Sequence, residues 1–324
     1  MNTPAFWYRP AGALAFALAP LGWIYAGTTA WRLAHGTPAR LPVPVICVGN
    51  LTAGGTGKTP IVRDLAARLA ARRRSPAILS RGYGGSERGP LKVDSALHQG
   101  ADVGDEPLLL AGDAACWVAA DRAEGGWAAV AGGADIVVMD DGLQNPALEQ
   151  DLRLVVADGT AGFGNGRAIP AGPLRETVAR GLARAHALIV VGEDRAGLAA
   201  RFAGRLPILT AKLEPRDAGW LAGTRVAALA GIGQPGKFRE TLIAAGAEIA
   251  SFNTFPDHHF YSGAELDAFI ADAERHKALP VTTEKDWVRL ASEWRSRIRP
   301  VIVGLAWQRP AAIEALLDLV TERG

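Results

Sequence analysis

The sequence predicts an α/β fold in which helices flank a parallel β-sheet, with a smaller C-terminal α/β domain and an apolar N-terminal helix. Three observations predict it. Short apolar runs alternate with Ala-, Leu- and Arg-rich runs along most of the chain, as in a parallel sheet wrapped by helices. A glycine-rich loop joins the first apolar run to the first helical run. The alternation resumes after a break near residue 216.

Size and composition limit the class of protein. The chain has 324 residues, of which 49% are hydrophobic, so more than one domain and a large core are expected. Its 35 basic and 33 acidic residues nearly balance, which gives no support to a nucleic-acid partner. Cys47 and Cys116 are the two cysteines. They suggest neither a disulfide framework nor a zinc site, and we expect both to be buried.

Residues 1–35 are predicted to form a membrane-associated helix. No charged residue lies between Ala11 and Trp31, leucines recur at helical spacing, and Trp and Tyr side chains are frequent, as at headgroup depth. Pro20 and several glycines make this stretch only weakly apolar for a helix that crosses the whole membrane. We expect a helix in the interface of the cytoplasmic leaflet; a true span and an ordinary packed helix are the alternatives. A cleaved signal peptide would export the glycine-rich loop away from cellular nucleotide.

The glycine-rich loop, residues 49–60, lies between an apolar run at 43–48 and a helical run at 61–74. Its backbone N–H groups and the start of the helix are suited to phosphate oxygens. Lys58 is expected to neutralise the β- and γ-phosphates of a nucleoside triphosphate, and Thr59 to offer its hydroxyl to Mg²⁺. Thr52 replaces the usual first glycine. The predicted phosphate contacts are Thr52, Ala53, Gly54, Gly55, Thr56, Gly57, Lys58 and Thr59.

Further apolar runs divide the rest of the chain into a core domain and a second α/β block. Core strands are expected at 77–80, 136–139, 152–157, 188–191 and 208–213, within a domain covering residues 36–215. The smaller domain is expected over residues 216–324, with the connection between residues 207 and 223. Its candidate strands are 226–230, 249–255, 280–283 and 301–305.

One pair of adjacent carboxylates lies at the end of a predicted strand, and another lies at the start of a predicted helix. Asp140 and Asp141 end an apolar strand, where carboxylates beside a phosphate loop can hold Mg²⁺. Neighbouring strand residues point to opposite faces, so we expect one to face the metal; a simple turn is the alternative. Asp105 and Glu106 open a predicted helix, and there helix capping is the alternative.

Adjacent histidines follow in a loop that is rich in aromatic residues, at positions 255–261. A histidine can pair with a carboxylate and help it to accept a hydroxyl proton. Polar packing is the alternative explanation for such a pair when it is considered alone. The motif becomes more informative together with the other motifs.

In their order along the chain, these motifs resemble the tetraacyldisaccharide 4′-kinase family, which phosphorylates the disaccharide precursor of lipid A at the cytoplasmic membrane surface. The resemblance covers nearly the whole chain. Several motifs in one order are far more specific than a single glycine-rich loop. The motifs are Gly49–Pro60, Ser80–Gly85, Val103–Pro107, Asp140–Gln144, Pro170–Glu176, Phe255–Tyr261 and Thr282–Asp286.

The resemblance implies transfer of the γ-phosphate of ATP, with Mg²⁺, to the 4′-hydroxyl of tetraacyldisaccharide 1-phosphate, which gives lipid IVA. It implies a peripheral or monotopic protein of the inner membrane that faces the cytoplasm and has no obligate protein partner. Asp105 with His258 would activate the hydroxyl, with Lys58 on the phosphates. The implied metal ligands are Thr59, Glu106, Asp140 and Asp141, and the implied substrate contacts are Tyr83, Arg122, Gln144, Arg175 and Glu176.

One position departs from the family pattern. Asn145 follows Gln144 where the family is expected to have histidine, and asparagine cannot carry a proton or a positive charge. Alternatives to the kinase are an NTPase that acts on another glycolipid, a nucleotide-dependent switch or metallochaperone, and a membrane-attached binding protein. A metallochaperone should have a Cys/His cluster, and the sequence shows none.

Overall fold

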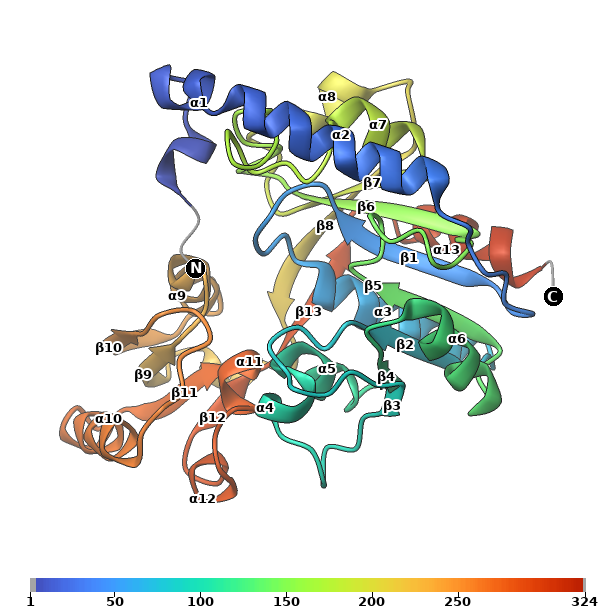
Figure 1. The fold of residues 1–324 in the computed structure, drawn as a ribbon. Helices are drawn as coiled ribbons and strands as arrows, with labels where there is room; N and C mark the ends of the chain where they lie inside the picture. The colour runs from blue at the N-terminus through green and yellow to red at the C-terminus, as the bar shows by residue number, and fades with distance from the viewer. Residues whose placement is uncertain (1–3, 323–324) are drawn as a thin grey trace.

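The computed structural model describes residues 4–322, which form two α/β units (Figure 1). The large unit is built on a nine-stranded sheet with the order β13-β8-β7-β6-β1-β5-β2-β4-β3, and the small unit on a four-stranded sheet with the order β10-β9-β11-β12. Parallel pairing dominates both sheets. The antiparallel pairs β13–β8 and β3–β4 lie at the two edges of the large sheet. The predicted α/β class is therefore confirmed.

The strands of the large sheet are short, and those at its centre are fully buried, as expected when helices cover both faces. Their bounds are β1 Val45–Asn50, β2 Pro76–Ser80, β3 Leu91–Lys92, β4 Ala115–Val118, β5 Ile136–Asp140, β6 Leu152–Asp158, β7 Ala187–Val191, β8 Ile208–Pro215 and β13 Val303–Trp307.

Alternate residues of each strand point into two separate cores. On one face, Ile46 and Val48 pack with α3 (Lys58–Ala71), α5 (Asp105–Leu110) and α13 (Pro310–Thr321). On the other face, Val45 and Cys47 pack with helices α6 (Arg122–Ala131), α7 (Val178–Ala183) and α8 (Leu198–Phe202). Helix α4 (Gly100–Val103) directly precedes α5. Both cysteines are buried, as predicted.

The small unit repeats this two-faced arrangement on a smaller scale, with one apolar cluster on each face of its parallel sheet. Its strands are β9 Arg225–Ala230, β10 Glu248–Thr254, β11 Leu279–Thr283 and β12 Arg299–Val301. Its helices are η2 Gly219–Leu221, α9 Pro235–Ala244, α10 Gly263–Arg275, α11 Glu284–Trp287 and α12 Ser292–Arg295.

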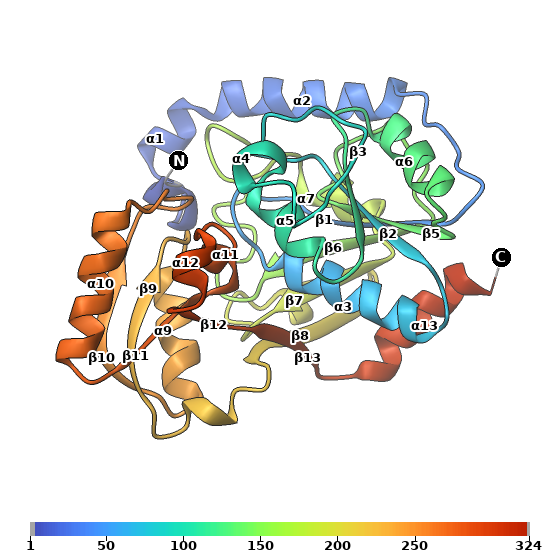
Figure 2. The same cartoon turned by 90° about the horizontal axis from the view of Figure 1, so that it is seen from below.

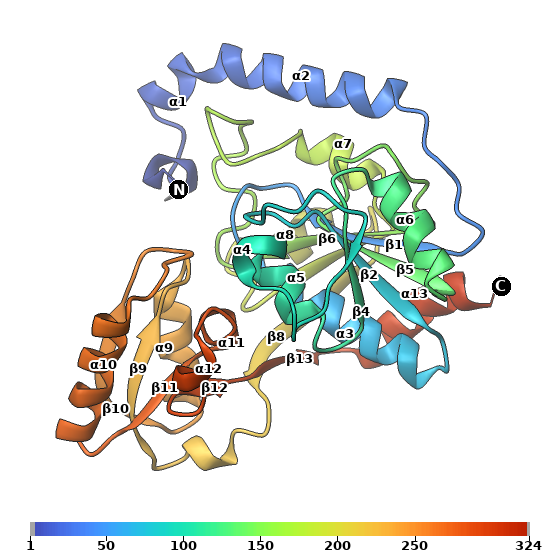
Figure 3. The same cartoon turned by 60° about the horizontal axis from the view of Figure 1, so that its bottom comes forward.

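The end of the chain differs from the predicted domain boundary of 216–324. The predicted strand at 301–305 is divided between the two sheets, because β12 pairs with β11 whereas β13 pairs with β8. Helix α13 then packs in the large core through Ile313 and Leu317, beside α3 (Figure 2). The small unit is thus residues 216–301. Figure 3 shows its two connections to the large unit side by side, where the Arg216 N–H donates to Ile302 O at 2.8 Å.

The N-terminal segment forms η1 (Ala5–Tyr8), α1 (Ala13–Ala17) and α2 (Ala19–His35), and α2 lies lengthwise along the large unit (Figures 2 and 3). Small residues face the protein: a side chain at Gly22 would meet Ala168 O at 2.8 Å. Large apolar residues are exposed instead, among them Trp23 at 72% and Trp31 at 65%. Within residues 4–322, no helix has both the length and the apolar character needed to cross a membrane.

Candidate active site

The glycine-rich loop follows β1 and turns directly into α3, whose first residue is Lys58, earlier than the predicted start at residue 61. Gly57 caps this helix at φ 82°, a left-handed conformation that glycine adopts without a steric penalty. The Asn50 side chain donates to Gly54 O at 3.2 Å and to Thr56 Oγ1 at 3.1 Å. The Ala53 N–H donates to Pro173 O at 2.7 Å. These bonds hold the loop in shape, and the Ala53 N–H is therefore already used.

The two carboxylates at the end of β5 have different surroundings. Asp141 lies 3.5 Å from Lys58 Nζ and 2.8 Å from Arg175 Nη1. Burial opposes its charge, but Lys58 and Arg175 outweigh burial and hold the pKa of Asp141 below its ordinary value. Burial, with the nearby Glu106, raises the pKa of Asp140 to about 7. Asp140 Oδ1 is buried without a hydrogen-bond partner, so it has a lone pair available to a cation.

Asp140 points to the face of the sheet that α3 and α5 cover, because it has the same parity along β5 as Val138. On that face Thr59 Oγ1 donates to Glu106 Oε1 at 3.3 Å. Lys285 of the small unit contacts the same oxygen. Burial opposes ionisation of Glu106, yet the charges of Lys285 and Lys58 hold its pKa below the ordinary value.

The oxygen donors of Thr59, Glu106, Asp140 and Asp141 fit a hard cation. Within residues 4–322, no three His, Cys, Asp or Glu side chains are already arranged around one metal position. Mg²⁺ is usually held by one or two carboxylates together with phosphate and water. The unpartnered Asp140 oxygen is the observation that favours this position for a metal.

The structure brings Asp105 and His258 together across the two units. His258 Nδ1 lies 2.9 Å from Asp105 Oδ2, and Arg289 Nε donates to the same oxygen at 2.7 Å. Arg289 Nη2 also lies 3.3 Å from His258 Nδ1. Arginine only donates, so these two contacts of Nδ1 require different tautomers of His258. The 2.9 Å contact with Asp105 is the shorter of the two, and it favours the tautomer whose Nδ1–H donates to the carboxylate. Burial opposes the charge of Asp105, while His258 and Arg289 hold its pKa below the ordinary value.

Sequence reasoning missed Arg289, although its side chain is only 3% exposed. It also donates to Gly231 O and to Asp286 Oδ1, both at 3.0 Å. The missed signal was the spacing of two cations. Arg289 lies four residues after Lys285, a spacing that favours one side of a helix, although α11 itself ends at Trp287. The Thr282–Asp286 motif drew attention to this segment without suggesting a role for it.

Three of the predicted substrate residues lie around one corner of the site. Gln144 Nε2 donates to Glu176 Oε1 at 2.9 Å and to Asn50 O at 3.1 Å. Glu176 is only 2% exposed, and both of its oxygens accept from Arg184 at 2.8 and 2.9 Å. Glu176 thus fixes the side chain of Gln144 by accepting its hydrogen bond. Arg184, which pairs with Glu176, is a second residue that the sequence analysis did not suggest. Arg175, by its contact with Asp141, joins this corner to the strand end.

The other two predicted substrate residues differ in exposure. Tyr83 is 76% exposed on the loop after β2, whereas Arg122 is 2% exposed at the start of α6. Arg122 Nη1 donates to Ala119 O at 2.5 Å, its Nε has no partner, and burial lowers its pKa. Asn145 Oδ1 accepts from the Ala147 N–H at 2.8 Å, so its side chain closes a local turn.

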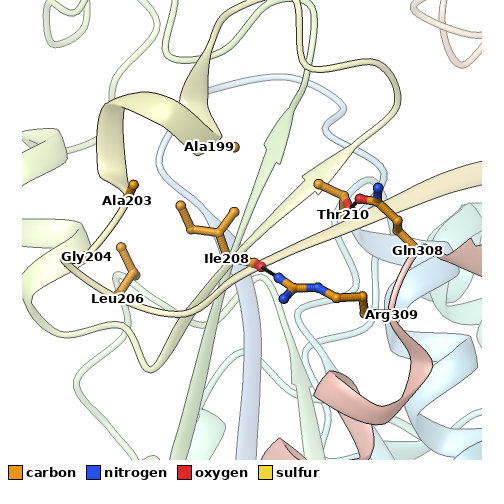
Figure 4. A pocket seen from close by; sticks show the side chains of 8 residues that line it. All are labelled: Ala199, Ala203, Gly204, Leu206, Ile208, Thr210, Gln308 and Arg309. Atoms are coloured by element: carbon orange, nitrogen blue, oxygen red, sulfur yellow. Dashed lines mark hydrogen bonds between the residues drawn. The ribbon is translucent and has the colours of Figure 1, made fainter.

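A hollow lies elsewhere, at the edge of the large sheet between α8 and β8 (Figure 4). Arg309 crosses its floor and donates to Ile208 O at 3.1 Å. None of the predicted site residues lines this hollow. Its lining residues are Ala199, Ala203, Gly204, Leu206, Ile208, Thr210, Gln308 and Arg309.

Comparison with known proteins gives one consistent match. Residues 14–321 match the model of the family described as "LpxK: Tetraacyldisaccharide-1-P 4'-kinase". The chain is 52% identical to the tetraacyldisaccharide 4'-kinase of Rhodospirillum centenum, over 98% of this chain and 96% of that protein. It is 52% identical to that of Gluconacetobacter diazotrophicus, over 98% of each.

A solved structure also matches over most of its length. It is the "apo" form of LpxK from Aquifex aeolicus in complex with ATP, which superposes with a TM-score of 0.76. The two sequences are 26% identical, and the match covers 95% of this chain and 99% of that chain. Both units of the fold are therefore shared with this structure.

Proposed function

The chain belongs to the tetraacyldisaccharide-1-P 4'-kinase family, and from this premise we propose which of its residues carry the reaction. The motif-based resemblance is confirmed. The chain is an ATP-dependent kinase that phosphorylates the 4′ position of the lipid A precursor. Phosphoryl transfer depends mainly on alignment of the reactants and on neutralisation of phosphate charge, so each residue is assigned to one of these tasks.

Asp105 accepts the proton of the 4′-hydroxyl. A sugar hydroxyl is hardly ionised at neutral pH, so a positioned carboxylate is needed as the bond to phosphorus forms. The contact at 2.9 Å between His258 and Asp105 is the observation that carries this proposal. Asp105 precedes Glu106, which contacts Thr59 of the phosphate-binding loop. The proposed base and this loop therefore lie close together between the two units.

Lys58 binds the β- and γ-phosphates from the start of α3. Thr59, Glu106, Asp140 and Asp141 hold Mg²⁺, with the unpartnered oxygen of Asp140 in support. When bound, Mg²⁺ neutralises charge on the phosphate oxygens. In the absence of Mg²⁺, Lys58 and Arg175 keep Asp141 ionised. Asp141 is therefore in the charge state that a metal ligand needs.

The acceptor lipid binds at the corner formed by Gln144 and Arg175. A guanidinium can hold a phosphate with two parallel hydrogen bonds, and binding energy from the lipid phosphate then orients the distant hydroxyl. Tyr83 lies at the exposed rim. Glu176 positions Gln144, and Arg122 supports the site from within α6.

The outer face of α1 and α2 rests in the membrane interface. Its exposed Trp23, Ile24 and Trp31 form an apolar surface on a helix whose small residues face the protein, which fits an interfacial helix. We place the protein on the inner membrane, peripheral or monotopic and facing the cytoplasm. Acyl tails then stay in the bilayer while the sugar reaches the site.

The proposal is tested with γ-labelled ATP, Mg²⁺ and the acylated disaccharide 1-phosphate in detergent. The wild type should label the lipid, and Asp105→Ala, His258→Ala and Lys58→Ala should label it far more slowly. Full transfer by Asp105→Ala would exclude Asp105 as the base while leaving the kinase assignment intact. Label on a different glycolipid only would favour the other acceptor.

A further inference from the structure

The Thr282–Asp286 motif has no role in the reaction as described so far, yet it ends in the segment that meets the proposed metal site. We propose that Lys285 competes with a metal ion for Glu106, and that its ammonium group moves away from this carboxylate when the metal binds. The inference rests on the proposed function, because it assumes that Glu106 is a metal ligand.

The position of the ammonium group is the first argument. Lys285 Nζ lies 2.5 Å from Glu106 Oε1. Thr59 Oγ1 donates to that same oxygen at 3.3 Å. The ammonium thus occupies the side of Glu106 that faces the other proposed ligand. A metal bound between Thr59 and Glu106 would lie beside the Lys285 ammonium, and repulsion between the two cations weakens the contact of each with this oxygen.

The charge of the cluster is the second argument. Glu106, Asp140 and Asp141 are the three carboxylates of the proposed metal site. Glu106 contacts Thr59, and Asp141 contacts Lys58, the preceding residue in the chain. Like charges held together in a partly buried site are unfavourable unless cations compensate them. Lys58 lies 3.5 Å from Asp141, and Lys285 is the cation that forms an ion pair with Glu106. Lys285 thus supplies compensation that the metal supplies when it is bound.

Comparison with Arg289 is the third argument, because the two cations lie on the same segment but are held very differently. Arg289 is 3% exposed and contacts Asp105, Asp286 and Gly231. Lys285 is 36% exposed, and Glu106 is its one ion-pair partner among the described residues. A lysine has a flexible stem and a compact ammonium group, so it can leave Glu106 while Arg289 keeps the segment in place.

Buried contacts around Asp286 fix the segment that carries Lys285. Asp286 is fully buried and accepts from the Gly231 N–H at 3.1 Å and from the Tyr261 hydroxyl at 2.8 Å. Release of Lys285 therefore breaks one ion pair between α11 and α5 and leaves the Arg289 anchor intact. Metal binding loosens the two units at one point without separating them.

The test is the affinity of the nucleotide-free protein for Mn²⁺, measured by electron paramagnetic resonance of the free ion. Lys285→Met removes the competing cation and should tighten Mn²⁺ binding on the order of tenfold. Lys285→Arg keeps the charge and should stay near the wild-type affinity. Lys237→Met is the matched control, since Lys237 also joins the small unit to a carboxylate of the large unit, Asp158, away from Glu106.

Unchanged or weaker Mn²⁺ binding by Lys285→Met would overturn the inference, and so would equal tightening by Lys237→Met, which would indicate a general charge effect. Glu106→Gln separates the two proposals. If it loses Mn²⁺ while Lys285→Met gains nothing, only the role of Lys285 fails. If it binds Mn²⁺ like the wild type, the metal site itself is wrong.

A second measurement covers the case of weak Mn²⁺ binding. Mg²⁺ with a non-hydrolysable ATP analogue should speed amide hydrogen exchange over residues 284–287 of the wild type, because the α11-to-α5 ion pair breaks. Lys285→Met lacks that pair from the start and should show no such change. No change in the wild type would contradict the inference.

Discussion

The carboxylates on the two sides of the site are held in different ways. Asp141, at the end of β5, is paired with Lys58 and Arg175, all within the large unit. Asp105 and Glu106, at the start of α5, are paired with Arg289, His258 and Lys285, all from the small unit. The first side depends on one folded unit, whereas the second exists only while two units are in contact.

This difference separates two tasks in one reaction. Nucleotide binding depends on the large unit, so it should survive changes at the contact between the units. Activation of the acceptor hydroxyl depends on that contact, so it should respond to changes in either unit. Substitutions on each side should therefore affect affinity and turnover differently.

Asp105→Asn is expected to have the largest effect. It removes the proposed proton acceptor and should lower kcat about 10³-fold, within the usual range for a lost general base. Affinity for a non-hydrolysable ATP analogue, measured by calorimetry, should be nearly unchanged because the ion-pair partners of Asp105 are His258 and Arg289 of the small unit. Lys58→Met is the contrasting variant and should weaken that affinity. Equal loss of analogue affinity in both variants would remove the distinction between the two sides.

Arg289→Met tests the contact from the small unit. It should lower kcat about 100-fold because Asp105 loses one of its two positioning partners. It should also cost about 3 kcal/mol in the free energy of unfolding, since buried Asp286 loses its paired cation, as measured by denaturant titration. Arg289→Lys keeps the charge and should recover part of both losses. Wild-type kcat in Arg289→Met would show that Asp105 needs no support from the small unit.

The exposed face of α2 belongs to neither side and provides a third region for comparison. Trp23→Ser with Trp31→Ser should reduce binding to anionic lipid vesicles about tenfold, because apolar area is lost from the interfacial face, while leaving ATP-analogue affinity unchanged. Trp127→Ser is the matched control, since Trp127 on α6 is 49% exposed. Similar vesicle binding by the double variant and the wild type would argue against membrane contact through this face.

The smallest expected effect concerns the returned helix α13. Glu314 pairs with Arg68 and Arg72 of the α3 region, and the pKa of Glu314 lies below its ordinary value mainly because Arg72 donates to it. A lowered carboxyl pKa adds stability above the unfolded pKa, near 4.5, and this stability is lost as pH falls through the folded pKa.

Glu314→Gln should therefore lower the melting temperature by about 1–2 °C at pH 7, a small shift because the pair is partly exposed. The difference between variant and wild type should disappear below about pH 4. A difference that persists at low pH would assign the effect to packing instead of charge. Differential scanning fluorimetry across this pH range measures both.

Much of the site followed from local patterns in the sequence. The glycine-rich loop, the acidic end of β5 and the pairing of Asp105 with His258 were all suggested by motifs, and the structure brings these residues close together. A domain boundary near residue 216 was also predicted from the sequence. Apolar periodicity identifies strands and helices because the spacing of apolar residues over a few positions indicates which side of the element is buried. The roles of these residues remain proposals.

Other features depended on how distant segments pack. The sequence by itself determined the class of fold, the phosphate-binding loop and the carboxylates near it, because each depends on residues that are close together in the chain. Only the tertiary structure decided that β13 and α13 return to the large unit, and that Lys285 and Arg289 reach Glu106 and Asp105. Those two pairs join residues 179 and 184 positions apart, and no local pattern specifies which distant charges will meet when two units pack together.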